Sequence, residues 1–248
     1  MKTGKMENKE GLCLDFLEIG SCDFDSMAES ITDDQHGMIV EPLTVYLSNI
    51  SNHKNLTKVN AAIMFDDGEI PIYYIEPKDI EEHGLHEFMR GCNKIGEPHD
   101  LHVDYFDTVA EIDVWQSYWK RPGAPKGRNL VNEGIVNTKN VPCMKFSTLF
   151  NKYNIKEIKL LKLDTEGFDA ELLQSFLDTL CDFNIRLPET ILFETNCHNP
   201  HELVFEVIKR LSHIGYYIEV GEATSNTWSV YTNTIYRDCK ATIRYKVL

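Results

Sequence analysis

Short apolar runs alternate along the chain with segments whose apolar residues recur at helical spacing. The runs that predict strands are 12–20, 37–42, 56–65, 69–75, 158–164, 189–196, 216–220, 232–240 and 241–247. The segments that predict helices are 26–34, 43–52, 145–154, 168–180 and 201–215. Strands that alternate with helices are typical of an α/β fold with a mostly parallel sheet.

This regularity fades between about residues 76 and 142, where prolines and glycines divide the chain into short pieces. We predict a single domain, 1–248, that carries this segment as an irregular insertion beside an acceptor site. Tyr73 and Tyr74 lie just before this segment, and Tyr105, Trp115, Tyr118 and Trp119 lie inside it. Their faces could stack on sugar rings, or the tryptophans, four residues apart, could pin a short helix to the core.

The chain is acidic, with 25 basic and 39 acidic residues and a formal net charge of −14. Such a surface repels phosphate backbones and anionic lipids, so we expect neither nucleic acid nor a membrane as the main partner. The seven cysteines form no CxxC pair, which favours free thiols in a reducing compartment. With no apolar signal core and no long apolar stretch, the sequence predicts a cytoplasmic protein.

The stretch LEIGSCDFDS, residues 17–26, ends the first predicted strand in a turn with one glycine, Gly20. Glu41 ends the next predicted strand, where a carboxylate can accept hydrogen bonds from a ribose diol. The loop lacks the further glycines that close approach to a pyrophosphate requires, so the pair favours a phosphate-free adenosine cofactor such as S-adenosylmethionine. An ordinary strand-turn-helix junction is the alternative for the loop alone.

A second motif, KLLKLDTEGFD at 159–169, gathers charge at the end of an apolar strand. Side chains alternate along a strand, so Lys162, Asp164 and Glu166 share a face if the chain stays extended. Burying them together costs desolvation unless they pair with one another or serve a site. A Lys162 bridge to either carboxylate, with Asp169 in the first turn of a helix, is the simpler interpretation.

Five stretches, in order from about residue 14 to 220, resemble the FkbM-type family of S-adenosylmethionine-dependent methyltransferases. They are VEPLTVYLSNI, VNAAI, CMKFSTLFNKYNIKEIKLLKLDTEGFDAELL, PETILFETN and HIGYYI. The resemblance implies the Rossmann-like class I methyltransferase fold, with a mostly parallel seven-stranded sheet, helices on both faces and an antiparallel last strand. It also implies methylation of hydroxyl groups, mostly on sugars and polyketide-type natural products.

The resemblance also assigns roles to individual residues. The cofactor loop would comprise Glu18, Gly20, Ser21 and Asp23; Glu41 would bind the ribose; Asn60 and Ala61 would lie beside the adenine; and Asp164 would face the methyl group and the acceptor. The second glycine that family loops carry near Phe24 is missing, which leaves open whether Asp23 and Asp25 bind the methionine part or cap the helix.

Methyl transfer to an alcohol requires a base that removes the hydroxyl proton. We predict Asp164 as that base, with Glu166 orienting it or the substrate, and expect their like charges to raise one of the two pKa values. Glu194 ends the neighbouring strand, where it could bind backbone, pair with Lys162, or hold Mg²⁺ together with Asp164 and Asn196.

The histidines at 83/86, 99/102 and 198/201 have helical spacing but no cysteine cluster, so we expect surface or loop positions, with His198 the one that could reach an acceptor. The sequence thus predicts an S-adenosylmethionine-dependent O-methyltransferase acting on a saccharide or glycan. Methylation of a non-sugar natural product and a non-catalytic Rossmann-like binding module are the alternatives. An NAD-dependent oxidoreductase fits less well, because the glycine-rich loop is absent.

Overall fold

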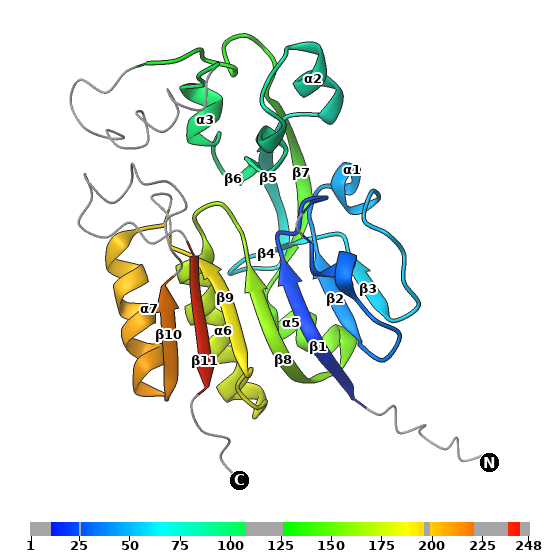
Figure 1. Cartoon of the computed structure of the whole chain (residues 1–248), viewed down its shortest axis with the longest axis vertical. Coiled ribbons are helices and arrows are strands. Elements are labelled where there is room, and N and C mark those ends of the chain that lie inside the picture. Colours follow the sequence, from blue (N-terminus) through cyan, green and yellow to red (C-terminus); the bar gives the residue numbers. More distant parts are fainter. Residues whose placement is uncertain (1–10, 25, 108–125, 196–198, 221–237, 244–248) are drawn as a thin grey trace.

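The computed structural model describes residues 11–24, 26–107, 126–195, 199–220 and 238–243, which form an α/β fold. The central sheet has the strand order β10-β11-β9-β8-β1-β2-β3 (Figure 1). Its strands are β1 (Leu12–Ile19), β2 (Gly37–Val40), β3 (Leu56–Val59), β8 (Ile155–Leu163), β9 (Thr190–Glu194), β10 (Tyr216–Val220) and β11 (Asp238–Ile243). Five of them, β3, β2, β1, β8 and β9, pair in parallel, and β11 is antiparallel to both β9 and β10. The predicted α/β class with a mostly parallel sheet is confirmed.

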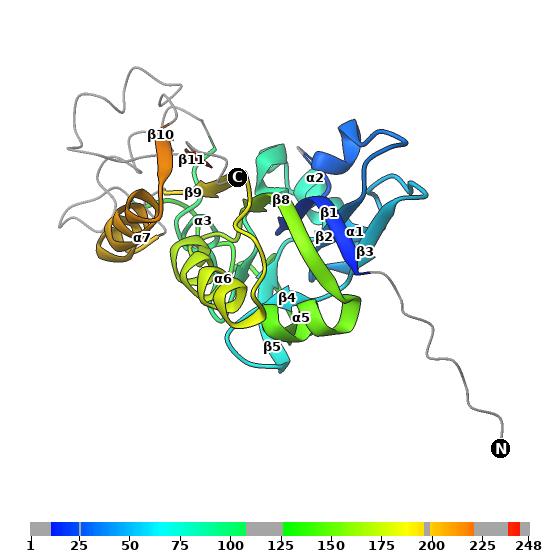
Figure 2. The ribbon, with the colours of Figure 1, turned by 90° about the horizontal axis from the view of Figure 1, so that it is seen from below.

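Three helices, α5 (Phe146–Tyr153), α6 (Asp169–Phe183) and α7 (His201–His213), lie on one face of this sheet (Figure 2). Their apolar sides bury the largest core cluster, in which Phe146, Phe150 and Phe176 meet edge to face with ring centroids 5.2 to 6.2 Å apart. Aromatic pairs prefer this geometry. The part of the chain that the structure describes contains no helix with the length and apolar character needed to cross a membrane.

The opposite face carries only short helical turns, η1 (Met27–Ser30) and α1 (Thr44–Leu47), where the sequence predicts longer helices. Ser26 caps η1, since its hydroxyl accepts the Ala28 N–H at 3.2 Å. Just after it, Thr32 donates its hydroxyl to the Asp34 carboxylate at 2.6 Å. Such local side-chain hydrogen bonds compete with helical ones and end the helix early.

A second sheet, with the order β4-β7-β5-β6, stands beside the carboxyl ends of the central strands (Figure 1). Its strands are β4 (Ala62–Ile63), β5 (Gly68–Tyr74), β6 (Lys94–Ile95) and β7 (Asn137–Met144). The single strand predicted at 56–65 is therefore wrong, because the chain divides it between β3 in one sheet and β4 in the other. The run predicted at 69–75 is confirmed as a strand, but it belongs to this second sheet.

The predicted insertion, 76–142, is more regular than its sequence indicates. It contains α2 (Pro77–Glu82), η2 (Glu87–Arg90), α3 (Asp100–Val103), β6 and most of β7. Strand β7 escapes prediction because the first half of its sequence, NTKNVPCM, is polar and the second half includes Pro142, yet it pairs with β5 over seven residues. Pairing with a preformed neighbour outweighs a weak local pattern.

Aromatic residues of the insertion serve mainly as core where the structure describes them. Tyr74 and Tyr105 are 7% and 1% exposed, so their faces are closed to a sugar. Tyr105 belongs to a buried cluster of the insertion that includes Met89 and Leu101. The tryptophans at 115 and 119 and Tyr118 lie outside the described residues.

Gly20 lies directly after β1, where two backbone segments come close together. Its φ is +80°, and a Cβ at this position would be 1.9 Å from the backbone oxygen of Asp164. The Asp164 N–H also donates to the Ile19 carbonyl at 3.0 Å. The ends of β1 and β8 are therefore joined at a point that only glycine fits.

We expect Gly20→Ala to lower the free energy of unfolding by about 3 kcal/mol, because it combines a left-handed alanine with a backbone clash. Gly134→Ala is the matched control, since Gly134 has φ +76° and no atom lies within 4 Å of the place that its Cβ would take. Only the conformational cost of about 1 kcal/mol applies there. Urea denaturation measures both variants, and equal losses would contradict the close approach at Gly20.

Candidate functional site

Glu18 is fully buried at the carboxyl end of β1, where it joins the following loop to β8. One of its oxygens forms an ion pair with Lys162 at 3.0 Å. The other accepts hydrogen bonds from the Ser26 hydroxyl at 2.8 Å and the Met27 N–H at 3.0 Å. The Glu18 carboxylate thus fixes the shape of the predicted cofactor loop and ties it to β8.

Glu41 lies just beyond β2 and is 4% exposed. Its two oxygens accept one backbone N–H each, from Leu43 at 2.8 Å and from Cys22 at 3.0 Å. Burial raises the pKa of Glu41 to about 7, against the opposing effect of these two hydrogen bonds. Glu41 follows the end of β2, as predicted, and it lies beside the Gly20 turn because Cys22 belongs to that turn.

Asp23 is held by side chains on two sides. Its carboxylate accepts a hydrogen bond from the Asn49 amide at 2.8 Å and lies 3.4 Å from the Arg90 guanidinium. The same guanidinium lies over the Phe24 ring, 5.2 Å from its centroid. The Cys22 thiol donates to the Arg90 carbonyl at 3.2 Å. Arg90 belongs to the insertion, 67 residues beyond Asp23 in the sequence, and no spacing in the sequence indicates this contact.

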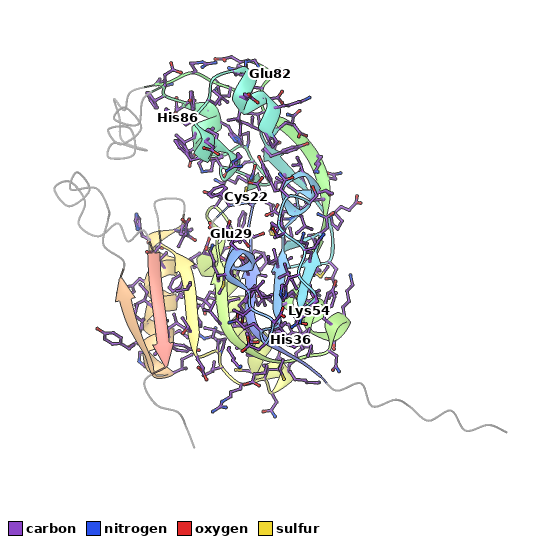
Figure 3. All side chains as sticks on the ribbon, turned by 45° about the vertical axis from the view of Figure 1, so that its right-hand side comes forward. Cys22, Glu29, His36, Lys54, Glu82 and His86 are labelled. Atoms are coloured by element: carbon purple, nitrogen blue, oxygen red, sulfur yellow. The ribbon has the colours of Figure 1, made fainter. Side chains whose placement is uncertain are left out.

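The remaining candidates are Asn60 and Ala61, predicted beside the adenine, and Ser21 of the cofactor loop. The Asn60 amide donates to the carbonyls of Glu41 at 3.0 Å and Pro42 at 2.9 Å, so it fixes the turn after β2. Ala61 is fully buried and Ser21 is 3% exposed. Figure 3 shows Cys22 of this loop where the central sheet meets the insertion, and His36 near the other end of the strands.

At the end of β8, Asp169 organises the turn that carries Asp164 and Glu166. Its carboxylate accepts hydrogen bonds from the Thr165 N–H at 3.2 Å and hydroxyl at 2.9 Å. Its other oxygen accepts the Glu194 N–H at 3.4 Å, which ties in the end of β9. Asp169 is the first residue of α6, as predicted, and burial raises its pKa to about 6.

Asp164 has the electrostatic environment expected of a general base. Burial, and next the nearby charge of Glu166, hold the pKa of Asp164 well above its ordinary value. The prediction that one of the two pKa values is raised is confirmed, with burial as the larger cause. Lys162 acts in the opposite direction but does not outweigh these effects.

Glu166 turns away from the strand direction and meets the insertion. Its φ of +53°, followed by Gly167 at +109°, ends the extended chain. One of its carboxylate oxygens lies 3.1 Å from Nε2 of His99. His99 and His102 are 1% and 0% exposed, so the expectation of surface positions is wrong for this pair, although His99 itself lies in the loop before α3. Their three-residue spacing reflects mutual contact at the start of α3.

Within the described ranges, no three His, Cys, Asp or Glu side chains are grouped to hold a metal ion. Glu194 ends β9, as predicted, but Asn196 and His198 lie outside the described residues. The magnesium alternative that includes Asn196 stays a prediction.

The raised pKa of Glu41 predicts a pH-dependent stability. The folded protein favours the protonated Glu41 carboxyl. The contribution of this group to the free energy of unfolding is therefore fully present below pH 4.5 and is lost as pH rises through about 7. The shift corresponds to about 3 kcal/mol at most. We expect Glu41→Gln to flatten the dependence of unfolding free energy on pH between 4.5 and 7.5, measured by urea denaturation. Glu82→Gln, at an exposed position in α2, is the control; equal slopes in both variants would contradict the assignment.

Comparison with known proteins identifies the family of this chain. A model of the methyltransferase FkbM domain matches residues 16–218, which include the Gly20 turn, Glu41 and the whole Asp164–Asp169 segment. No curated protein matches the chain. Because the family model spans most of the sequence, the chain belongs to the FkbM methyltransferase family.

Proposed function

We propose that this methyltransferase is an S-adenosylmethionine-dependent O-methyltransferase with a Rossmann-like class I fold, acting on a hydroxyl group of a saccharide or glycan. Family membership supports methyl transfer. The observation that carries the cofactor proposal is the buried Glu41 carboxylate beside the Gly20 turn. In open α/β sheets, ligands bind at the carboxyl ends of the strands, which is where both residues lie.

The donor and acceptor groups of this turn fit an adenosine. Each Glu41 oxygen accepts one backbone N–H, and a carboxylate oxygen can accept a second hydrogen bond. Two ribose hydroxyls can therefore donate to Glu41 without displacing the contacts that shape the loop. Such bonds favour the ionised carboxylate, so cofactor binding is expected to lower the pKa of Glu41.

The bound cofactor would supply a methyl group activated by a positively charged sulfur. The chain's own contribution is to hold the acceptor hydroxyl in line and to remove its proton. We assign proton removal to Asp164, whose raised pKa suits a base near neutral pH. Glu166 lies close enough to raise that pKa, and Glu194 ends the adjacent strand β9.

The acceptor class rests on the sequence resemblance. Of the aromatic residues considered for sugar stacking, Tyr74 and Tyr105 are core. A test panel therefore includes non-sugar alcohols beside monosaccharides and disaccharides.

Calorimetry with S-adenosylhomocysteine tests the cofactor assignment. We expect Glu41→Ala to weaken binding at least tenfold, because it removes hydrogen bonds to a charged group worth about 1.5–3 kcal/mol each. Glu82→Ala, at an exposed position in α2 away from Cys22 (Figure 3), is expected to bind as the wild type does. If the wild type fails to bind, the proposal falls and the non-catalytic binding module is favoured. If Glu41→Ala binds S-adenosylhomocysteine as tightly as the wild type does, Glu41 has no role at the ribose.

Transfer of a radiolabelled methyl group from S-adenosylmethionine to the acceptor panel tests the base. Asp164→Asn is expected to lower turnover by about 10²- to 10⁴-fold, the usual contribution of a general base. Wild-type turnover is expected to rise with pH as Asp164 ionises. Asp182→Asn, exposed at the end of α6, is the matched control. Full turnover by Asp164→Asn would exclude it as the base.

A further inference from the structure

His99 connects the insertion to the turn that carries the proposed base. We infer that His99 is a positioning residue that fixes the Glu166 carboxylate beside Asp164, so that the insertion sets the geometry of the acceptor side of the site. This inference rests on the proposed function, in which Asp164 is the base and the acceptor lies beside it. The contact itself is a partly buried hydrogen bond between two segments 67 residues apart.

The hydrogen bonds of the ring determine its tautomer. Nδ1 accepts the Leu101 N–H at 3.1 Å, so it carries no proton. In the neutral ring the proton is then on Nε2, which donates to the Glu166 oxygen at 3.1 Å. Because both nitrogens are engaged, His99 has no free position with which to accept a proton from a substrate. It acts through Glu166.

The donor is held rigidly. The His99 backbone N–H donates to Nδ1 of His102 at 3.2 Å, and the two rings meet edge to face with centroids 5.8 Å apart. His102 is fully buried, and burial lowers its pKa to about 3, so it stays neutral and keeps accepting that bond. A side chain that is 2% exposed and held at both nitrogens has little freedom to follow a moving carboxylate.

The contact with His99 helps to hold Glu166 in its turn. A non-glycine residue with a positive φ, here +53°, costs about 1 kcal/mol and persists where its surroundings hold it. Its side chain is 19% exposed, against 2% for His99, so a released carboxylate could turn toward water. Releasing it would move a negative charge away from Asp164.

A separate contact from the same insertion reaches the other loop. Arg90 lies 3.4 Å from Asp23 and covers Phe24. The insertion therefore contacts both the predicted cofactor loop and the turn after β8. His99 is its contact on the acceptor side.

The test uses His99→Asn and the ligand-free protein. An asparagine oxygen can still accept the Leu101 N–H, since asparagine is a favoured residue before a helix, but its side chain is too short to reach Glu166. Titration of the Asp164 carboxyl by ¹³C NMR is the readout. We expect its midpoint to fall by at least half a pH unit in His99→Asn and to recover in His99→Gln, whose amide N–H reaches further. An unchanged or raised midpoint in His99→Asn overturns the inference.

His86→Asn is the matched control, because His86 lies in the insertion and contacts the Asp107 carbonyl rather than the site. Its Asp164 midpoint is expected to equal that of the wild type. Should His99→Asn fail to fold, ¹⁵N NMR of the wild-type ring decides: a neutral Nε2–H tautomer at pH 8 supports the inference, and an Nδ1–H tautomer or a cation overturns it.

Calorimetry with S-adenosylhomocysteine separates this inference from the proposed function. His99→Asn is expected to bind within threefold of the wild type, because the ring nitrogens of His99 hydrogen-bond Glu166 and the Leu101 N–H of its own helix. A tenfold loss would assign His99 to the cofactor side and overturn the positioning role. If the wild type does not bind at all, the proposed function falls, while the Asp164 titration still tests the contact.

Discussion

The close approach of Gly20 to the backbone of Asp164 is the constraint on which the rest of the site depends. It places the turn after β1 against the turn after β8, with no space for a Cβ between them. The candidate cofactor residues follow the first turn, and the candidate catalytic residues follow the second. Any side chain at residue 20 would separate the two groups, because one of the two backbones would have to shift.

Around this point the protein buries several carboxylates, and hydrogen bonds make their burial tolerable. Glu18 forms an ion pair with Lys162, and Glu41 and Asp169 accept backbone N–H groups. The hydrogen bonds do not fully offset desolvation, so the pKa values of Glu41 and Asp169 stay raised. Perturbed acids concentrated at strand ends are typical of functional sites. A positively charged methyl donor would complement this negative region, which agrees with the proposed cofactor.

The insertion forms a buried cluster of its own and also contacts the candidate site. It reaches the first turn through Arg90 and the second through His99, both by side chains that the described structure shows in direct contact with acidic partners. The positive charge of Arg90 matches the Asp23 carboxylate, and the Nε2–H of His99 donates to the Glu166 carboxylate. Variation in this segment could therefore alter acceptor geometry while the central sheet stays the same, since loops on a rigid sheet commonly carry specificity.

The sequence by itself determined the α/β class, the parallel strands β1, β2, β8 and β9, and the placement of Gly20, Glu41 and Asp164 at strand ends. These features follow from local rules: apolar runs form buried strands, and a single glycine permits a positive φ. The helices α5 and α6 are also predicted, because their apolar periodicity is continuous. The prediction ends α5 at Asn154, its left-handed cap, but ends α6 at residue 180, short of Phe183 and its cap Asn184.

Only the tertiary structure decided the second sheet, the division of residues 56–65 between two sheets, and the partners of Asp23 and Glu166. Strand β7 is too polar to be recognised alone, and its pairing with β5 depends on a neighbour more than 60 residues away. Arg90 and His99 likewise reach partners that lie 67 residues from them in the sequence. Contacts of this kind depend on how the chain packs in three dimensions, so the periodicity of the sequence does not predict them.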